Sequence, residues 1–359
     1  MTMQNTPLLM SKILGRGAKL DPDVEVVTMQ AEGTHRQTLK QTWDRANQLA
    51  HALSTHGIEI GDRIASFMWS NYRHLELYQG VPSMGSVLHT LNIRLSSTDL
   101  EYIINHAGDK IIFADEDLLP LLEPLWGKVP CVELLVICRH GEGGESSFEN
   151  QVDYEDFIAA QATEYDWPEI DETSPMGLCY TSGTTGKPKG VMYTNRSTYL
   201  HTMAECLTDS LGLSSLDSVL GIVPMFHAMG WGLPFCASML GCKQVMPHRF
   251  MTPDAFLQLI HDEKVTISAG VPTIWQGVRA TLEATPAKYD LSALTRLTCG
   301  GSAPPVEMMR WYWDSHNIEM IQGWGMTETN PLGTLSRKVA KRSHMGISED
   351  QQFENIAKA

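Results

Sequence analysis

Segments with helical spacing alternate with short apolar runs along this 359-residue chain, and this alternation limits the folds that it can adopt. Apolar residues recur every three or four positions from Leu39 to Leu53, and the run 64–68 follows after a Gly-Asp-Arg turn. The same order returns where a helical segment at 254–264 begins behind a Thr-Pro pair and the run 265–269 follows. Strands that alternate with helices of this length predict an α/β fold, with two packed subdomains whose largely parallel sheets are flanked by helices.

The length of the chain and one polar segment predict where the subdomains divide. A chain of 359 residues is long for a single hydrophobic core. The polar, glycine-rich segment 139–151 is the best candidate for a linker. We therefore expect a first α/β subdomain at 1–150 and a second at 151–359, which contains the motifs described below.

The charge and the cysteines exclude several classes of function. A formal net charge of −15 opposes binding to nucleic acid, which needs a basic surface. No stretch has the roughly eighteen consecutive apolar residues of a membrane-spanning helix, and the N-terminus lacks the pattern of a signal peptide. Seven cysteines occur singly, as is typical of a reducing compartment. We therefore expect a cytoplasmic protein without an integral membrane segment.

A loop at 180–190, with the sequence YTSGTTGKPKG, has the composition of a phosphate-binding site. A glycine-rich backbone can point several N–H groups at one anion, while hydroxyl groups add donors and lysines add positive charge. The common P-loop is excluded because two residues, not four, separate Gly183 from Gly186, and a proline follows Lys187. The alternative is a solvated polar turn. The residues expected to bind the phosphates of a nucleotide are Thr181, Ser182, Gly183, Thr184, Thr185, Gly186, Lys187 and Lys189.

Three motifs in this order resemble those of the adenylate-forming (AMP-binding) superfamily. The loop resembles its phosphate-loop signature, GGSAPP at 300–305 its adenine and acyl-pocket loop, and QGWGMTET at 322–329 its second nucleotide signature. The segment 85–113 looks most like the medium- and long-chain fatty acyl-CoA synthetases of that superfamily. The resemblance implies a two-step ligation. The carboxylate of an acid attacks the α-phosphate of ATP and releases pyrophosphate, and the thiol of coenzyme A then takes the acyl group.

The resemblance also implies which residues hold the nucleotide and a magnesium ion. Glu328 is the one carboxylate of its motif, and a carboxylate among phosphates needs a cation between them. The matching glutamate of the family serves Mg²⁺, assisted by a hydroxyl that corresponds here to Thr181. Thr327 would donate to the α-phosphate. The residues expected around the nucleotide, besides the loop, are Gly301, Ser302, Gln322, Gly323, Trp324 and Thr327.

The segment PMFHAMGWG at 224–232 carries the resemblance to the catalytic and acyl-binding residues. His227 resembles the histidine that borders the acyl carbonyl. Trp231 resembles the tryptophan that gates the fatty-acid tunnel of long-chain members, with room for its ring to swing beside Gly230 and Gly232. The expected catalytic residues are His227, Thr327 and Glu328.

The remaining pocket segments bear on the acid. Neither 268–273 nor 299–303 offers a charged side chain, which favours a carboxylic acid with an apolar tail, of medium or long chain. A short, branched or aryl acid remains the alternative. The residues expected to contact the acid are His227, Trp231, Gly300, Gly301 and Ala303.

The sequence departs from the family pattern after Glu328. Family members continue with a Thr-Gly-Asp stretch and a small C-terminal lid domain, whose lysine bridges the acyl carboxylate and the α-phosphate, and neither follows here. A lysine about 4 Å from a forming charge contributes about 4 kcal/mol at an effective dielectric near 20, or about a thousandfold in rate. We therefore expect a fragment or a natural truncation of low activity. The alternative is a non-catalytic module that binds nucleotide or acyl groups, and the resemblance is compatible with a homodimer.

Overall fold

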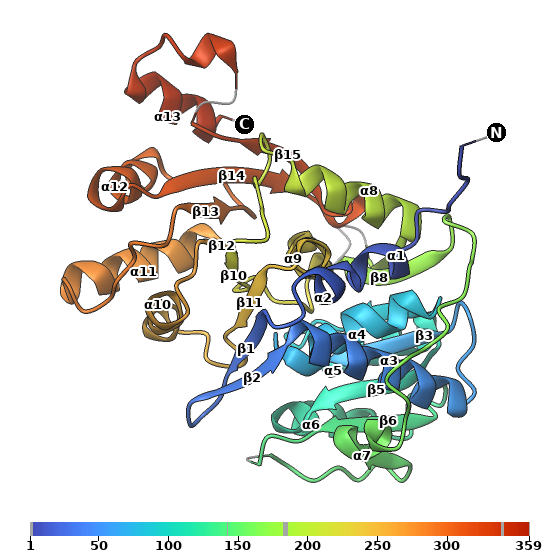
Figure 1. Ribbon diagram of the computed structural model, residues 1–359. Helices are drawn as coiled ribbons and strands as arrows, with labels where there is room; N and C mark the ends of the chain where they lie inside the picture. The colour runs from blue at the N-terminus through green and yellow to red at the C-terminus, as the bar shows by residue number, and fades with distance from the viewer. Residues whose placement is uncertain (1–2, 142, 182–185, 339–340, 359) are drawn as a thin grey trace.

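The computed structural model of the protein describes residues 3–141, 143–181, 186–338 and 341–358. Two β-sheets and the helices that flank them make up the fold, so the predicted α/β class is confirmed (Figure 1). The seven-stranded sheet has the order β7 (Gln151–Asp153), β6 (Leu134–Cys138), β5 (Asp109–Asp115), β3 (Arg63–Phe67), β4 (Val87–Thr90), β8 (Pro175–Thr181) and β9 (Lys189–Thr194). The eight-stranded sheet has the order β15 (Leu332–Ser336), β14 (Glu319–Gly325), β13 (Arg296–Cys299), β12 (Ile267–Gly270), β10 (Ser218–Leu220), β11 (Lys243–Met246), β1 (Glu25–Met29) and β2 (Thr34–Thr38).

Both sheets are largely parallel, as predicted. Antiparallel pairing joins β8 to β9, β14 to β15 and β1 to β2, and the other strand pairs of both sheets are parallel. The antiparallel hairpins lie at sheet edges, whereas the inner strands need crossover helices to run in the same direction.

The α-helices connect these strands and cover their faces. They are α1 (Ser11–Leu14), α2 (Arg16–Leu20), α3 (Leu39–Thr55), α4 (Tyr72–Ser83), α5 (Ser97–Ala107), α6 (Leu119–Leu122), α7 (Tyr154–Ala159), α8 (Asn195–Cys206), α9 (Leu233–Leu240), α10 (Pro253–Asp262), α11 (Pro272–Ala284), α12 (Val306–His316) and α13 (Glu349–Ala357). Short 3₁₀ turns are η1 (Glu116–Leu118), η2 (Glu123–Leu125), η3 (Ala228–Gly232), η4 (Thr327–Thr329) and η5 (Arg342–His344).

The two sheets exchange strands across the middle of the sequence. Strands β1 and β2 come from the first forty residues, yet β1 pairs with β11 and β2 extends the same eight-stranded sheet. Strands β8 and β9 follow residue 151, yet they complete the seven-stranded sheet through β4. The sheets therefore divide the chain differently from the 1–150 and 151–359 subdomains, and that division stays a prediction.

The local sequence explains how the longest helix begins and ends. The Thr38 hydroxyl accepts a hydrogen bond from the Gln41 N–H, and the Gln41 side chain accepts one from the Thr38 N–H. This reciprocal capping box satisfies donors that the first turn leaves without a partner. Gly57 follows the helix with a φ of 76°, a left-handed conformation that a glycine adopts without steric cost. The helical spacing from Leu39 to Leu53 therefore predicted α3 correctly.

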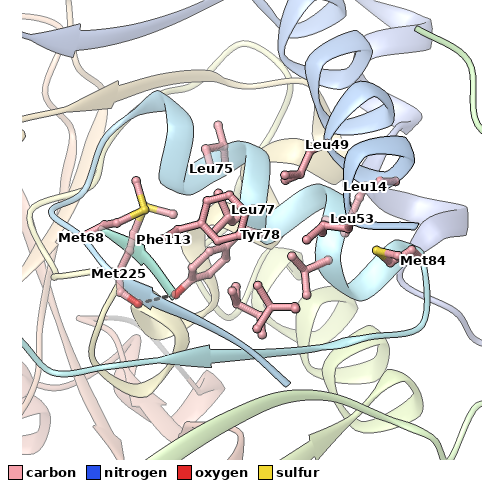
Figure 2. Close-up of a cluster of buried hydrophobic side chains, with 14 of the residues drawn as sticks. Leu14, Leu49, Leu53, Met68, Leu75, Leu77, Tyr78, Met84, Phe113 and Met225 are labelled. Carbon is pink, nitrogen blue, oxygen red and sulfur yellow. Dashed lines mark hydrogen bonds between the residues drawn. The ribbon is translucent and has the colours of Figure 1, made fainter. Parts of the chain in front are cut away.

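Helix α4 is the buried centre of the molecule. All of its residues are buried, because it packs on β3, β4 and β8 of one sheet and on β1 of the other. Figure 2 shows Leu75, Leu77 and Tyr78 of this helix among side chains from α1, α3 and β5. The Tyr78 hydroxyl donates to the carbonyl oxygen of Met225, which ties α4 to the segment before η3 (Figure 2). This core joins the first third of the chain to the region that forms the candidate site.

Among the described residues, no helix is both long enough and apolar enough to cross a membrane.

Candidate functional site

A cavity of about 120 Å³ lies at the carboxyl edge of the eight-stranded sheet. Gly300 and Gly301 follow β13 directly, and Trp324 lies near the end of β14. The carboxyl ends of neighbouring parallel strands meet at one edge, where open α/β sheets bind ligands. Turn η3 forms another wall of the cavity through Ala228 and Trp231. Three sequence segments that are far apart thus meet around one space.

Seven of the predicted site residues line this cavity. They are His227, Trp231, Gly300, Gly301, Gly323, Trp324 and Thr327. The resemblance assigned some of them to the acid and others to the nucleotide, and the fold brings both groups to the same place. The placement is consistent with those roles, which remain predictions.

Turn η3 has an unusual backbone. Ala228, Met229 and Trp231 have φ values of 36°, 44° and 52°, in the left-handed region where a non-glycine residue costs roughly 1–2 kcal/mol. The Trp231 ring packs against the backbone of Gly300, because a Cβ added at Gly300 would lie 2.9 Å from the Trp231 Cη2 atom. Strained backbone of this kind persists only where the surrounding packing enforces it, and it is typical of functional sites.

The two glycines beside Trp231 make room for neighbouring side chains rather than for the indole ring. A Cβ at Gly232 would lie 2.0 Å from the Oε2 atom of Glu205, and one at Gly230 would lie 3.3 Å from the Pro234 ring. Gly232 is therefore needed because the Glu205 carboxyl occupies the space that a side chain would take. The expected space for a swinging indole ring is filled on that side.

Glu205 of α8 is a buried carboxyl that the sequence did not single out. It lines the cavity, and only 2% of its surface is exposed. Burial raises the pKa of Glu205 from 4.5 to about 8, so the carboxyl is protonated at neutral pH. The Cys236 thiol donates to Glu205 Oε2 at 3.0 Å, and His201 Nδ1 lies 3.5 Å from the same oxygen. Burial also lowers the pKa of His201 to about 4, so at pH 7 this is a contact between neutral groups.

His227 borders the cavity and is exposed to solvent. Desolvation by the surrounding residues lowers its pKa below the usual range, and the positive charge of Arg94 lowers it further. The imidazole is therefore neutral at pH 7. A neutral imidazole can accept one hydrogen bond and donate another, which suits a residue beside a reacting carbonyl group.

Helix α8 and strand β9 hold the second nucleotide signature in position. The Tyr193 hydroxyl donates to the Thr327 carbonyl oxygen at 2.7 Å. The Ser197 hydroxyl donates to Asn330 Oδ1 at 2.6 Å, and the Leu332 N–H donates to His201 Nε2 at 3.1 Å. These bonds join β9 and α8, which follow the glycine-rich loop, to the segment 327–332, although more than a hundred residues separate the two in sequence.

The other predicted residues do not line the cavity. Thr181 ends β8, and Lys189 begins β9 with an exposed side chain. The Lys187 ammonium lies 4.7 Å from the centre of the Tyr102 ring on α5. Ser182, Gly183, Thr184 and Thr185 lie outside the described residues. Gly186 lies beside Lys187, near α5. Ser302 and Ala303 follow Gly301 and are exposed. Gln322 is buried in β14, and Glu328 is exposed in η4.

Several cavity residues were not singled out individually from the sequence. Glu205 and Leu211 come from the region of α8 and the loop after it, and Ala269 and Thr298 come from the ends of β12 and β13. The segment around Ala269 was expected to form part of the pocket as a stretch, without a named residue. No spacing or motif in the sequence distinguishes Glu205 from a glutamate on the surface of a helix.

Comparisons with known proteins agree with this arrangement. The model of the family described as AMP-binding enzyme matches residues 15–351. The chain is 39% identical over 353 residues to a medium-chain-fatty-acid–CoA ligase of Ectopseudomonas oleovorans, covering 98% of this chain and 64% of that protein. It is also 39% identical over 356 residues to a 3-methylmercaptopropionyl-CoA ligase of Ruegeria pomeroyi, covering 98% and 65%. A long-chain-fatty-acid–CoA ligase of Thermus thermophilus is 38% identical over 358 residues, which cover 99% of this chain and 64% of that protein.

The fold matches solved structures as well. An anthranilate CoA ligase in complex with anthranoyl-AMP has a TM-score of 0.82 at 24% identity, covering 95% of this chain and 65% of that one. The N-terminal domain of FACL13 from Mycobacterium tuberculosis has a TM-score of 0.79 at 23% identity, covering 92% and 78%. At such identity the likeness establishes the fold alone. The chain spans about 64% to 65% of the length of the curated relatives described above.

Proposed function

Because the chain belongs to the family of AMP-binding enzymes, we propose that the protein acts in the ligation of a carboxylic acid to coenzyme A. In the first step a carboxylate oxygen bonds to the α-phosphorus of ATP and pyrophosphate leaves, which gives an acyl-adenylate. In the second step the thiol of CoA gives up its proton to solvent, its sulfur bonds to the acyl carbon, and AMP leaves with the electrons of the broken acyl–oxygen bond. The CoA ligase names of the relatives support this assignment of an acid–thiol ligase.

The observation that carries the proposal is the convergence of His227, Gly300, Trp324 and Thr327 on one cavity. The neutral imidazole of His227 would accept or donate a hydrogen bond beside the acyl carbonyl group. Trp324 has 49% of its surface exposed, so its ring offers a free face for the adenine. Thr327 would donate to the α-phosphate, with its backbone held by Tyr193.

Phosphate and metal binding would come from the glycine-rich loop and η4. Glu328 carries an exposed carboxylate in η4, close enough to the β8–β9 hairpin that its charge helps to raise the pKa of Tyr193, after burial and Cys179. Carboxylate and hydroxyl oxygens are the ligands that Mg²⁺ prefers, so these residues fit the ion. We assign it to Glu328 and Thr181, where it would neutralise phosphate charge when bound. Lys187 and Lys189 would add positive charge to the phosphates.

The lining of the cavity favours an acid with an apolar tail. Leu211, Leu233 and Ala269 are apolar, and no lysine or arginine lines the described cavity. A medium- or long-chain fatty acid is therefore the first candidate, since each buried methylene contributes about 0.8 kcal/mol. The protonated carboxyl of Glu205 favours a second candidate, a short sulfur-containing or aryl acid whose polar atom accepts a hydrogen bond.

Two further properties belong to the proposal. All seven cysteines are free, which fits a reducing compartment such as the cytoplasm. A homodimer is an expectation from the family resemblance, to be measured by sedimentation velocity.

The test is ATP–pyrophosphate exchange with a panel of acids from propionate to palmitate, extended to benzoate and 3-(methylthio)propionate. Exchange that depends on one class of acid would establish adenylation and name the substrate. The variant Lys187→Ala should weaken Mg·ATP binding, whereas Lys128→Ala, which removes an exposed lysine elsewhere, should not. Mg·ATP binding without exchange for any acid would support a nucleotide-binding module instead. Absence of both would refute the proposal.

A further inference from the structure

A second group of polar side chains lies where the carboxyl ends of β5, β6 and β11 come together. Asp115 is the last residue of β5, His140 follows β6 by two residues, and His248 follows β11 by two. The first two strands belong to the seven-stranded sheet and the third to the eight-stranded sheet. None of the three residues lines the candidate active-site cavity.

The three side chains lie close enough together to share one metal ion. One ligand atom from each residue lies within 4.8 Å of the other two. His140 Nε2 lies 3.3 Å from Asp115 Oδ1, and His248 Nε2 lies 3.9 Å from Asp115 Oδ2. Both Nε2 atoms are buried, and neither makes a well-aligned hydrogen bond with the residues that the structure describes, although both lie close to the Asp115 carboxylate. Buried polar atoms normally have a partner, so two such nitrogens beside one buried carboxylate are unusual.

We propose that Asp115, His140 and His248 bind a zinc ion. Two imidazole nitrogens and one carboxylate oxygen form a ligand set that Zn²⁺ uses. With bonds of about 2.0–2.1 Å, tetrahedral geometry places neighbouring ligand atoms about 3.3 Å apart. The distance from His140 Nε2 to Asp115 Oδ1 already has this value. His248 Nε2 lies 3.9 Å from the other carboxylate oxygen, so the His248 ring and the carboxylate must shift toward each other when the ion binds.

The surroundings hold the ligands in place. The Trp69 N–H donates to Asp115 Oδ2 at 2.8 Å, and the Asn71 side-chain amide donates to both carboxylate oxygens. These bonds fix the orientation of the carboxylate, as outer contacts do in known metal sites. The His248 backbone has a φ of 54°, and its N–H donates to the Ser70 carbonyl oxygen at 3.0 Å. A histidine in left-handed backbone is uncommon, and here that conformation directs its ring at Asp115.

A separate cavity of about 250 Å³ adjoins the cluster. This cavity is lined by both histidines and by polar residues that include Thr28, Asn71 and Arg249. A water molecule from the cavity would complete a tetrahedron with the three protein ligands. The ion would also join the two sheets, because His248 comes from one and Asp115 with His140 from the other.

The first experiment uses the unmodified sequence without an affinity tag. The protein is equilibrated with zinc sulfate, dialysed and analysed for metal content, and its zinc K-edge X-ray absorption is recorded. We expect about one zinc per chain, an absorption spectrum with two imidazoles and no sulfur, and a higher Tm in the zinc-loaded protein. Zinc bound through sulfur would overturn the proposal, because the cluster contains no cysteine. Absence of bound zinc would overturn it as well.

A second experiment compares matched histidine variants. His140→Gln and His248→Asn should each lower zinc affinity at least about a hundredfold, measured by competition with a chromophoric chelator. His316→Gln removes an imidazole on α12, outside the cluster, and should bind zinc like the unmodified protein. Circular dichroism establishes that each variant is folded. Equal zinc affinity in all three variants would assign the ion to another place and overturn the proposal.

Discussion

The buried carboxyl of Glu205 predicts a dependence of stability on pH that the variant Glu205→Gln should remove. Burial raises the pKa of this group from 4.5 to about 8 in the folded protein. Between these two values the folded chain holds a proton that the unfolded chain has released, so stability falls as the pH rises. The decline begins near pH 4.5 and ends near pH 8. Each pH unit within this window costs about 1.4 kcal/mol, or about 4 kcal/mol from pH 5 to pH 8.

This free energy corresponds to a measurable change in melting temperature. At ~2.1 cal/mol/K per residue, a chain of 359 residues unfolds with an entropy of about 0.75 kcal/mol/K, so about 4 kcal/mol corresponds to about 5 °C. Glutamine has nearly the same shape as the protonated glutamate and does not titrate. The Tm of Glu205→Gln relative to the unmodified protein should therefore rise by about 5 °C between pH 5 and pH 8.

Differential scanning calorimetry at pH 5, 6, 7 and 8 measures this difference. Glu149→Gln is the matched control, because Glu149 is exposed and the same substitution there should give a Tm difference that does not change with pH. A constant Tm difference for Glu205→Gln across the range would refute the reasoning. A difference that is larger at pH 5 than at pH 8 would refute it too, since the sign would be reversed.

Three further predictions concern the candidate active site. Tyr193→Phe removes the hydroxyl that donates to the Thr327 carbonyl oxygen. The lost hydrogen bond stabilises the second nucleotide signature by about 1 kcal/mol, so the Kd of Mg·ATP measured by calorimetry should rise about fivefold. An unchanged Kd would contradict the role of this bond. Gly300→Ala places a methyl group 2.9 Å from the Trp231 ring. In the exchange assay the KM for the preferred acid should therefore rise, while the KM for ATP stays the same. Equal changes in both KM values would contradict an acyl pocket there. Lys187→Ala should weaken Mg·ATP binding more at low than at high salt, because the lysine is exposed and salt ions screen its charge. A loss of affinity that does not depend on salt would indicate a structural role for Lys187.

Local patterns in the sequence determined the type of secondary structure and the order of the motifs. The helical spacing from Leu39 to Leu53 and the glycine after it predicted α3, because capping and periodicity depend on residues close in sequence. Alternation of helices and strands predicted the parallel sheets for the same reason. The three motifs supplied the family resemblance, and together with the segment 224–232 they supplied seven residues that line one cavity.

Only the tertiary structure decided which strands share a sheet and which polar groups lose contact with water. Strand β1 pairs with β11, more than two hundred residues away, and nothing in either strand specifies the other. Glu205 has the sequence context of a surface helix residue, yet packing against Gly232 buries its carboxyl and changes its pKa. Asp115 and His248 likewise meet only because two sheets come together. Burial and long-range pairing are properties of the whole packed chain, so they appear only when all the elements are in place.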